Sequence, residues 1–445
     1  MTVRKLVTRR EFVRQAAAIG SATVMAPTII SSTAFGKPGA PGPNDRVTIG
    51  FIGCGRQTNE YNIPLFVNTP GVQVLAVCDV DSWRLGKSVE LIKQQYSSGS
   101  IKGSSSDVAS YVDYQDLLAR QDIDAVCIGT PDHWHVKMTL DALQAGKDVA
   151  LEKPITRTIR DGQRLIEAVQ KQGRVFRVDS EFRSLVPCHR ATSLVRNGYL
   201  GQVRRVEVGV PVMDSYCAPQ PTMDVPEELD YKRWLGEAPP APYTEKRVHP
   251  RKSFDRPGWF SIMDYADGVI TNWGAHLNDG AMWAVDKERV GPTEISGRGK
   301  YLPADSFYNV LAEFDLNYRF ADGLEWRYRT DAPYIRIEGD EGWVWADFEE
   351  FRAEPKSLLT VELKSSDQVF PLKSEKQDFI ECVRSRKEPI EPIEVGHRVT
   401  SLGLLGNICI YLGESLRWDP RQERFLNNDK ANELLDKPIC KPPSV

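Results

Sequence analysis

The chain has 445 residues, a formal net charge of −4, and a composition that is 41% hydrophobic and 27% charged. This balance is typical of a globular protein and excludes a collagen-like, disordered or disulfide-framework chain. A domain has ~150 residues, so the length predicts two or three domains. The sequence lacks the basic excess of a nucleic-acid-binding protein, and we expect no nucleic-acid partner.

Residues 1–34 have the features of an export signal. Arg9 and Arg10 precede a mildly apolar run over 16–30, and small residues follow at 32–34. This order predicts a twin-arginine signal peptide that is cleaved after Ala34, and hence a periplasmic or otherwise exported protein delivered by the twin-arginine export machinery. The apolar run is short, so we expect no stable membrane insertion of the mature chain. Residues 35–45, rich in Pro and Gly, are predicted to be a linker.

Residues 46–179 alternate between predicted strands and helices. The strands fall at 46–52, 72–78, 125–128, 148–151 and 174–178, and the helices at 114–120, 136–145 and 161–172, with a polar insertion at 97–107. This alternation predicts a doubly wound parallel sheet of the Rossmann type. The eight cysteines have no metal-binding or framework spacing; we predict no metal site and leave a single disulfide open.

A glycine turn joins the first strand to the next helix. Gly53 permits the tight turn, and Gly55 lets the backbone approach a pyrophosphate at the helix N-terminus. Thr58 stands where the fingerprint has a third glycine. Asp79 ends the second strand, where a carboxylate binds ribose hydroxyls and repels a 2′-phosphate, so NAD is favoured over NADP. The predicted cofactor contacts here are Gly53, Gly55, Arg56, Gln57 and Asp79.

Two polar stretches follow later strands of the same sheet, where cofactor and substrate should meet. One is GTPDHWH at 129–135, and the other is EKP at 152–154. The two neighbouring histidines could indicate a metal, but a third ligand at suitable spacing is missing. We therefore expect further cofactor contacts from Thr130, Pro131, His133, His135, Glu152 and Lys153.

Together these motifs resemble the Gfo/Idh/MocA family of glucose–fructose oxidoreductase, inositol dehydrogenase and rhizopine-catabolism proteins, and more narrowly its exported, twin-arginine branch. The resemblance also includes AGKDV before EKP, the segment 264–279, and DFIECVRSRKEPI…GHR…WDP. It implies an NAD(P)-binding domain at 46–179, followed by an α/β domain at 180–445 with a large, mostly antiparallel open sheet. Strand-like segments at 308–316, 324–329, 334–338 and 343–348 support that sheet independently. In relatives the sheet mediates oligomerisation, so we expect a homodimer or homotetramer.

The resemblance also assigns catalytic residues. It places Lys153 beside the nicotinamide, with a cis bond before Pro154, where the lysine can bind the reacting oxygen or pass on its proton. Relatives pair an aspartate and a histidine four residues apart on one helix face. Here His276 matches the histidine and is predicted to be the base. Asn272 replaces the aspartate; it can bind a sugar hydroxyl but cannot relay a proton.

Three further residues are predicted to contact the substrate or to support the residues that do. Asp279 could orient the His276 ring or cap the helix locally, and these two roles stay open. Arg183 and Tyr265 are predicted to contact sugar hydroxyls. The long Pro-rich segment 211–257 is expected to wrap over the active site or to contact another subunit.

The predicted function is NAD(P)-dependent oxidation of a sugar, polyol or related carbohydrate by hydride transfer. An exported enzyme lacks a replenished nicotinamide pool, so the cofactor should be tightly bound and retained. One alternative is a redox-neutral NAD-dependent glycosidase or epimerase. A second is a vestigial sugar-binding protein, a reading to which Asn272 lends some weight.

Overall fold

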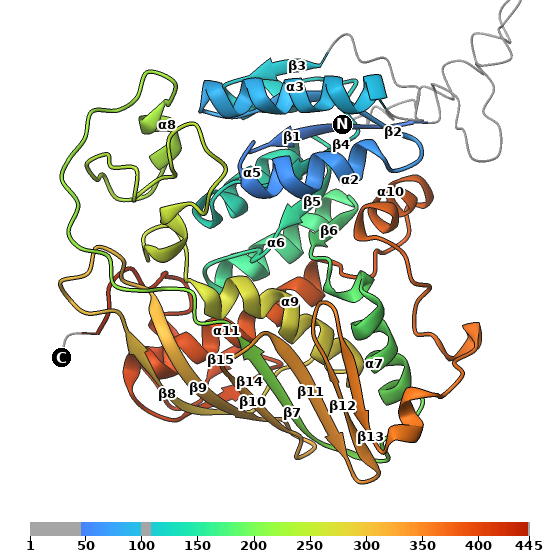
Figure 1. The fold of residues 1–445 in the computed structure, drawn as a ribbon. Helices are drawn as coiled ribbons and strands as arrows, with labels where there is room; N and C mark the ends of the chain where they lie inside the picture. Colours follow the sequence, from blue (N-terminus) through green and yellow to red (C-terminus); the bar gives the residue numbers. More distant parts are fainter. Residues whose placement is uncertain (1–45, 99–107, 444–445) are drawn as a thin grey trace, which may run out of the picture. The chain divides into compact units, whose positions relative to one another are not determined.

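The computed structural model describes residues 46–98 and 108–443. The predicted signal peptide, the linker and most of the polar insertion lie outside these residues. From Val47 onward the chain forms one compact unit that contains two β-sheets (Figure 1). Among the described residues, no helix combines the length and the apolar character needed to cross a membrane. The eight cysteines are all unpaired.

The first sheet has six described strands, which are all parallel, in the order β3-β2-β1-β4-β5-β6. They are β1 (Val47–Ile52), β2 (Val72–Cys78), β3 (Ala109–Tyr111), β4 (Ala125–Ile128), β5 (Asp148–Glu152) and β6 (Phe176–Asp179). The helices between them are α2 (Ile63–Val67), α3 (Ser82–Ser98), α4 (Tyr114–Leu118), α5 (His135–Gln144) and α6 (Ile159–Gln172). Strands covered on both faces need nearly continuous apolar runs, as in β4, which is AVCI. The predicted parallel, doubly wound sheet is confirmed.

The second sheet has nine described strands in the order β13-β12-β11-β7-β10-β9-β8-β14-β15. They are β7 (Val203–Val210), β8 (Glu294–Tyr301), β9 (Leu311–Arg319), β10 (Glu325–Thr330), β11 (Tyr334–Gly339), β12 (Gly342–Ala346), β13 (Phe351–Glu354), β14 (Leu416–Asp419) and β15 (Arg424–Phe425). The β7–β10 pairing is parallel and the other pairings described in this sheet are antiparallel. The predicted open, mostly antiparallel sheet is confirmed, although the sequence patterns did not predict the strands β7, β8, β13, β14 and β15.

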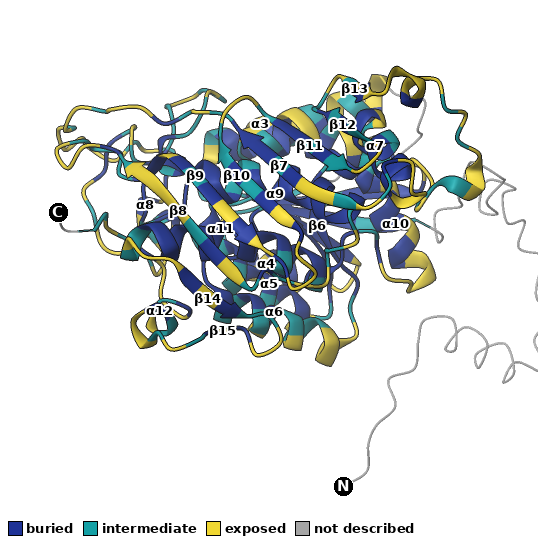
Figure 2. Cartoon of the chain, turned by 90° about the horizontal axis from the view of Figure 1, so that it is seen from below, coloured by how far each residue is buried: buried dark blue, intermediate teal, exposed yellow. Residues whose placement is uncertain are grey.

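Helices separate the two sheets. The second half of the chain contributes α7 (Val186–Arg196), α8 (Tyr231–Leu235), α9 (Val269–Ala284), α10 (Glu375–Ser385), α11 (Ile393–Leu412) and α12 (Asp429–Glu433). The strands of the large sheet contain both exposed and buried residues, whereas α9 and α11 are almost wholly buried (Figure 2). Helices with apolar residues around most of their circumference need such a buried setting. Helix α10 packs back on the first sheet, where Phe379 and Ile380 join the same apolar cluster as Phe51 and Phe66.

Candidate functional site

A pocket of about 790 Å³ lies at the carboxyl ends of β1, β4 and β5. This edge is where open parallel sheets bind their ligands, and the volume falls in the range of small-molecule sites. The predicted residues that line it are Gly53, Gly55, Arg56, Gln57, Asp79, Thr130, Pro131, Glu152, Lys153, Asn272 and His276. Most of the cofactor contacts, both expected catalytic residues and one expected substrate ligand thus meet in one cavity.

The glycine turn has the geometry that its residue types require. Gly53 has φ of 91°, and a Cβ there would lie 2.7 Å from the backbone of Gly129, so no larger residue fits. A Cβ on Gly55 would meet nothing closer than 4.0 Å, which leaves its backbone open to the pocket. Asp79 fastens the turn, because its carboxylate accepts hydrogen bonds from the amides of Cys54 (2.6 Å) and Asp81 (2.8 Å). Burial raises the pKa of Asp79 to about 6.

Buried polar atoms without partners mark the adjoining wall of the pocket. Thr130 Oγ1 and Asp132 Oδ2 form no hydrogen bond with any described residue, although both residues line the cavity. Burial raises the pKa of Asp132 to about 8, so this carboxyl is protonated at neutral pH and can donate. Polar groups left unpaired in a protein interior are costly unless a ligand satisfies them. The open turn and these groups therefore fit a bound dinucleotide.

Lys153 and Glu152 reach the pocket from the end of β5. The Lys153–Pro154 peptide bond is cis, as the resemblance implied. The Glu152 carboxylate accepts a hydrogen bond of 2.9 Å from Asn62 Nδ2, and burial raises the pKa of Glu152 to about 7. Lys153 lines the pocket beside it, at the position where a charged group can act on a bound substrate.

Helix α9 carries Asn272 and His276 on one face, four residues apart, and both line the pocket. His276 Nδ1 lies 2.9 Å from Ser180 Oγ and 3.5 Å from Glu181 Oε2. Burial lowers the pKa of His276 to about 4, so the ring is neutral at neutral pH and able to accept a proton. Phe348 packs edge-on against the ring, with 6.0 Å between centroids.

Two acidic residues that line the pocket were not predicted from the sequence. One is Asp132, which lies inside the GTPDHWH stretch, and the other is Glu181, which lies just beyond β6. A position directly after a predicted parallel strand is itself a signal for ligand binding, and that signal could have identified Glu181.

His133 and His135, which are predicted to contact the cofactor, are not among the residues that line the pocket. His135 is buried, with Nδ1 2.8 Å from the Pro154 carbonyl oxygen and Nε2 2.9 Å from that of Thr130. The neutral ring thus lies between the loops after β4 and β5 and can donate its single N–H to one of these two carbonyl oxygens. His133 Nε2 lies 3.2 Å from the Trp234 carbonyl oxygen, and its ring packs edge-on against Trp234 and at a tilt against Tyr265. Burial lowers both pKa values, to about 4 for His135 and about 3 for His133.

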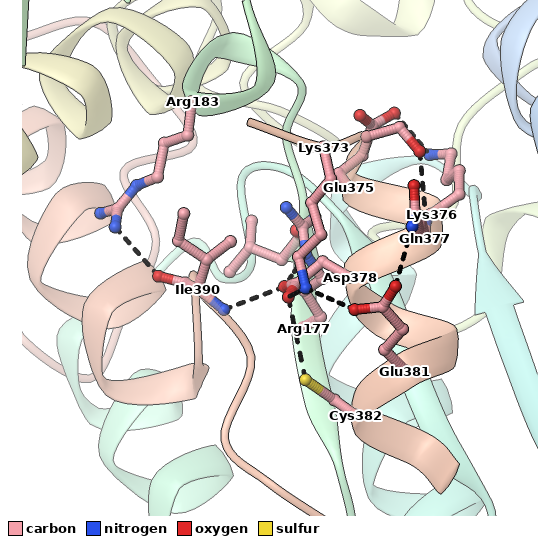
Figure 3. A network of polar contacts seen from close by, with 12 residues as sticks. Arg177, Arg183, Lys373, Glu375, Lys376, Gln377, Asp378, Glu381, Cys382 and Ile390 are labelled. Atoms are coloured by element: carbon pink, nitrogen blue, oxygen red, sulfur yellow. Dashed lines mark hydrogen bonds and ion pairs between the residues drawn. The ribbon is translucent and has the colours of Figure 1, made fainter. Parts of the chain in front are cut away.

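Arg183, Asp279 and Tyr265, which are predicted to contact the sugar, are not among the residues that line the pocket. The Arg183 guanidinium donates to both carboxylate oxygens of Asp279, at 2.9 and 2.8 Å from Nε, and both side chains are at most 1% exposed. Arg183 also donates to the Ile390 carbonyl oxygen, which ties it to the Arg177–Asp378 network beneath α10 (Figure 3). Tyr265 is fully buried, 3.4 Å from Arg247 through its hydroxyl. The buried contacts of these three residues are with other protein groups.

The segment 211–257, predicted to wrap over the active site or to contact another subunit, contributes to the wall of the pocket. Met213, Trp234, His249, Arg256 and others of its residues line the cavity. Backbone hydrogen bonds fasten it to the β2–α3 turn: Ser82 donates to Glu228 (2.8 Å), and Asp230 donates to Val80 (2.9 Å). The Arg84 guanidinium donates to the Ser253 carbonyl oxygen at 2.7 Å.

The parallel sheet, its glycine turn and the pocket at the strand ends define a Rossmann-type dinucleotide-binding protein. Residues 47–180 match the family described as "Oxidoreductase family, NAD-binding Rossmann fold", and residues 215–444 match "Oxidoreductase family, C-terminal alpha/beta domain". The chain belongs to the Gfo/Idh/MocA family, and its first part is an NAD-binding domain. The resemblance seen in the motifs is confirmed for the family, while the exported branch stays a prediction.

Curated relatives include a "Glycosyl hydrolase family 109 protein" of Shewanella pealeana, 31% identical over 174 residues, and an "Alpha-N-acetylgalactosaminidase" of Shewanella oneidensis, 28% identical over 176 residues. Each match covers 37% of this chain and 37% of the relative. Similar solved structures include the aldose-aldose oxidoreductase from Caulobacter crescentus complexed with glycerol (TM-score 0.61, 18% identity). Another is the WlbA dehydrogenase from Bordetella pertussis in complex with NADH and UDP-GlcNAcA (TM-score 0.58, 17% identity). Both comparisons cover 84% of this chain and 99% of the other, and they show a shared fold.

Proposed function

We propose that the chain is an NAD-dependent glycosidase whose net reaction is hydrolysis and whose cofactor stays bound between turnovers. The observation that carries the proposal is the presence of the dinucleotide turn, Lys153 and His276 around one pocket. The curated relatives named as glycosyl hydrolases support the glycosidase over the oxidoreductase as the main reading. Their matches span only 37% of their length, so the activity rests on the experiment below.

Bound NAD would supply the oxidation of one ring carbon at the start of a turnover and its reduction at the end. Lys153 would bind the oxygen of the reacting hydroxyl and stabilise negative charge on it. His276, neutral at neutral pH, would remove the acidified proton from the neighbouring carbon, after which elimination breaks the glycosidic bond. Asn272 would hold a further sugar hydroxyl. Water would then add where the leaving group departed, a proton would return to the neighbouring carbon, and the ring carbon would be reduced again, so that no net oxidation occurs.

The test is turnover of p-nitrophenyl glycosides, beginning with the α-N-acetylgalactosaminide, by the purified chain. We expect the chain with its retained NAD to release p-nitrophenol without added cofactor and without build-up of NADH, and we expect a Lys153→Met variant to lose this release. Accumulation of NADH in step with sugar oxidation would instead establish an ordinary dehydrogenase. Binding of the sugar without turnover, in protein that holds NAD, would establish a vestigial sugar-binding protein.

Export and cofactor retention form a second part of the proposal. Twin-arginine export carries folded proteins, so NAD acquired before export would remain in the pocket beneath the segment 211–257. N-terminal sequencing of exported protein should begin at residue 35, and replacing Arg9 and Arg10 with lysines should block export. Dialysed protein should keep about one dinucleotide per chain. Protein that loses all its NAD on dialysis would contradict retention.

A further inference from the structure

The two ring nitrogens of His276 have different surroundings. Nδ1 faces Ser180 Oγ at 2.9 Å and Glu181 Oε2 at 3.5 Å. Nε2 has no hydrogen bond with any described residue, and the ring lines the pocket. A base held at one nitrogen by a hydroxyl and a carboxylate, with the other nitrogen free for substrate, has the arrangement of an oriented general base.

Glu181 reaches this ring from a different element than the helix that carries His276. It lies two residues beyond β6, at the same sheet edge as the pocket, and its side chain is 39% exposed. The neighbouring position on α9 that could face the ring, 272, holds an uncharged amide. Glu181 is therefore the carboxylate nearest to His276.

The charges around the ring come from two strand ends. Glu181 and Asp179, at the end of β6, favour the protonated ring, and Lys153, at the end of β5, disfavours it. From the segment after β12, Phe348 packs edge-on against the ring. Burial by itself would raise the pKa of Glu181, but the charges of His276 and Lys153 outweigh burial and hold that pKa below its ordinary value. Glu181 is thus ionised at neutral pH.

We propose that Glu181 is a positioning residue for His276, fixing the ring in the pocket and supplying the negative charge that position 272 lacks. The pairing deepens the proposed glycosidase mechanism and rests on it for the role of the base. The contact between the two side chains does not depend on the reaction, so the two ideas can fail separately.

The first test follows the His276 ring by NMR in chain labelled at the imidazole carbons of its six histidines. A His276→Gln variant assigns the signal, and titration runs from pH 8 down to the acid limit of the folded protein. Opposite charges within ~4–6 Å shift a pKa by about 1–3 units. Glu181→Gln, close in shape, should therefore lower the titration midpoint by about one unit or more. Ser180→Ala, which removes the neutral partner, should change it less.

Position 272 offers a matched rescue. Side chains four residues apart on a helix face each other, so Asn272→Asp should raise the His276 midpoint, and in the Glu181→Gln background it should restore a value near that of wild type. We expect the highest titration midpoint in Asn272→Asp, intermediate and similar midpoints in wild type and the double variant, and the lowest midpoint in Glu181→Gln. The proposal is overturned if Glu181→Gln titrates like wild type, or if Ser180→Ala has the larger effect.

The second readout is the acid limb of the pH profile of kcat/KM on p-nitrophenyl glycosides. Glu181→Gln should move this limb to lower pH and reduce the plateau about ten-fold, because a weaker base removes a proton less efficiently. Asn272→Asp in that background should reverse both changes. If no glycoside is cleaved, the glycosidase fails and the NMR titration still decides the pairing. If glycosides are cleaved and the His276 titration midpoint is the same in Glu181→Gln as in wild type, only the proposed pairing is wrong.

Discussion

Breaking the Arg183–Asp279 ion pair should destabilise the protein without removing a substrate contact. The two side chains are at most 1% exposed, and Arg183 donates to both carboxylate oxygens of Asp279. Asp279→Asn keeps the shape of the side chain but removes its negative charge. The buried positive charge of Arg183 is then balanced mainly by Glu288, at 3.0 Å. Removing one partner of a buried pair typically costs ~3–5 kcal/mol.

Urea unfolding followed by tryptophan fluorescence measures this loss, and NAD and glycoside affinities are measured on the same variant well below its unfolding midpoint. We expect the free energy of unfolding to fall by ~3–5 kcal/mol and both affinities to change by less than about three-fold. Asp340→Asn is a matched control, since Asp340 pairs with Arg204 on the exposed surface, and should leave the unfolding midpoint unchanged. A stable Asp279→Asn variant that loses glycoside binding would refute the structural role and restore the original prediction of a sugar contact.

Three further predictions concern the pocket. Gly53→Ala should abolish NAD binding in calorimetry, since its φ is 91° and a Cβ would lie 2.7 Å from Gly129, whereas Gly173→Ala, at a helix C-cap with open space around it, should bind NAD normally. Lys153→Met should lower kcat about 10²–10⁴-fold in the glycoside assay while the chain still binds NAD. Burial raises the pKa of Asp132 in the folded protein from 3.8 to about 8, so its protonated form favours folding, and this contribution is lost as pH rises from about 4 to 8. Unfolding curves of Asp132→Asn should lack that part of the pH dependence; identical curves would contradict the burial argument.

The nucleotide-binding half was accessible from sequence because its signals are local. Strand β2 was predicted at its observed bounds, since a strand buried on both faces is a continuous apolar run between turn residues. Gly53 could be assigned because only glycine suits a tight turn between a strand and a helix. Such features depend on residues that are neighbours in the chain.

The errors arise where contacts join distant residues. Ser180 and His276 are 96 positions apart, and no local pattern places Glu181 beside that ring. Asp279 shares the helix face of Asn272 but lies roughly 10 Å further along the axis by the helical rise. There Arg183, coming from the segment after β6, covers it. Sequence periodicity predicts which residues share a helix face, but it does not predict which of them a distant segment of the chain will cover.

The proposed reaction is redox-neutral, and in it His276 removes a proton next to the oxidised carbon. The most direct test is glycoside turnover in D₂O with the purified, NAD-loaded chain, followed by NMR of the released sugar. We expect one deuterium from the solvent at the ring carbon that neighbours the transiently oxidised carbon, and we expect no NADH to form. Released sugar that carries no deuterium, or an oxidised sugar formed together with NADH, would contradict it.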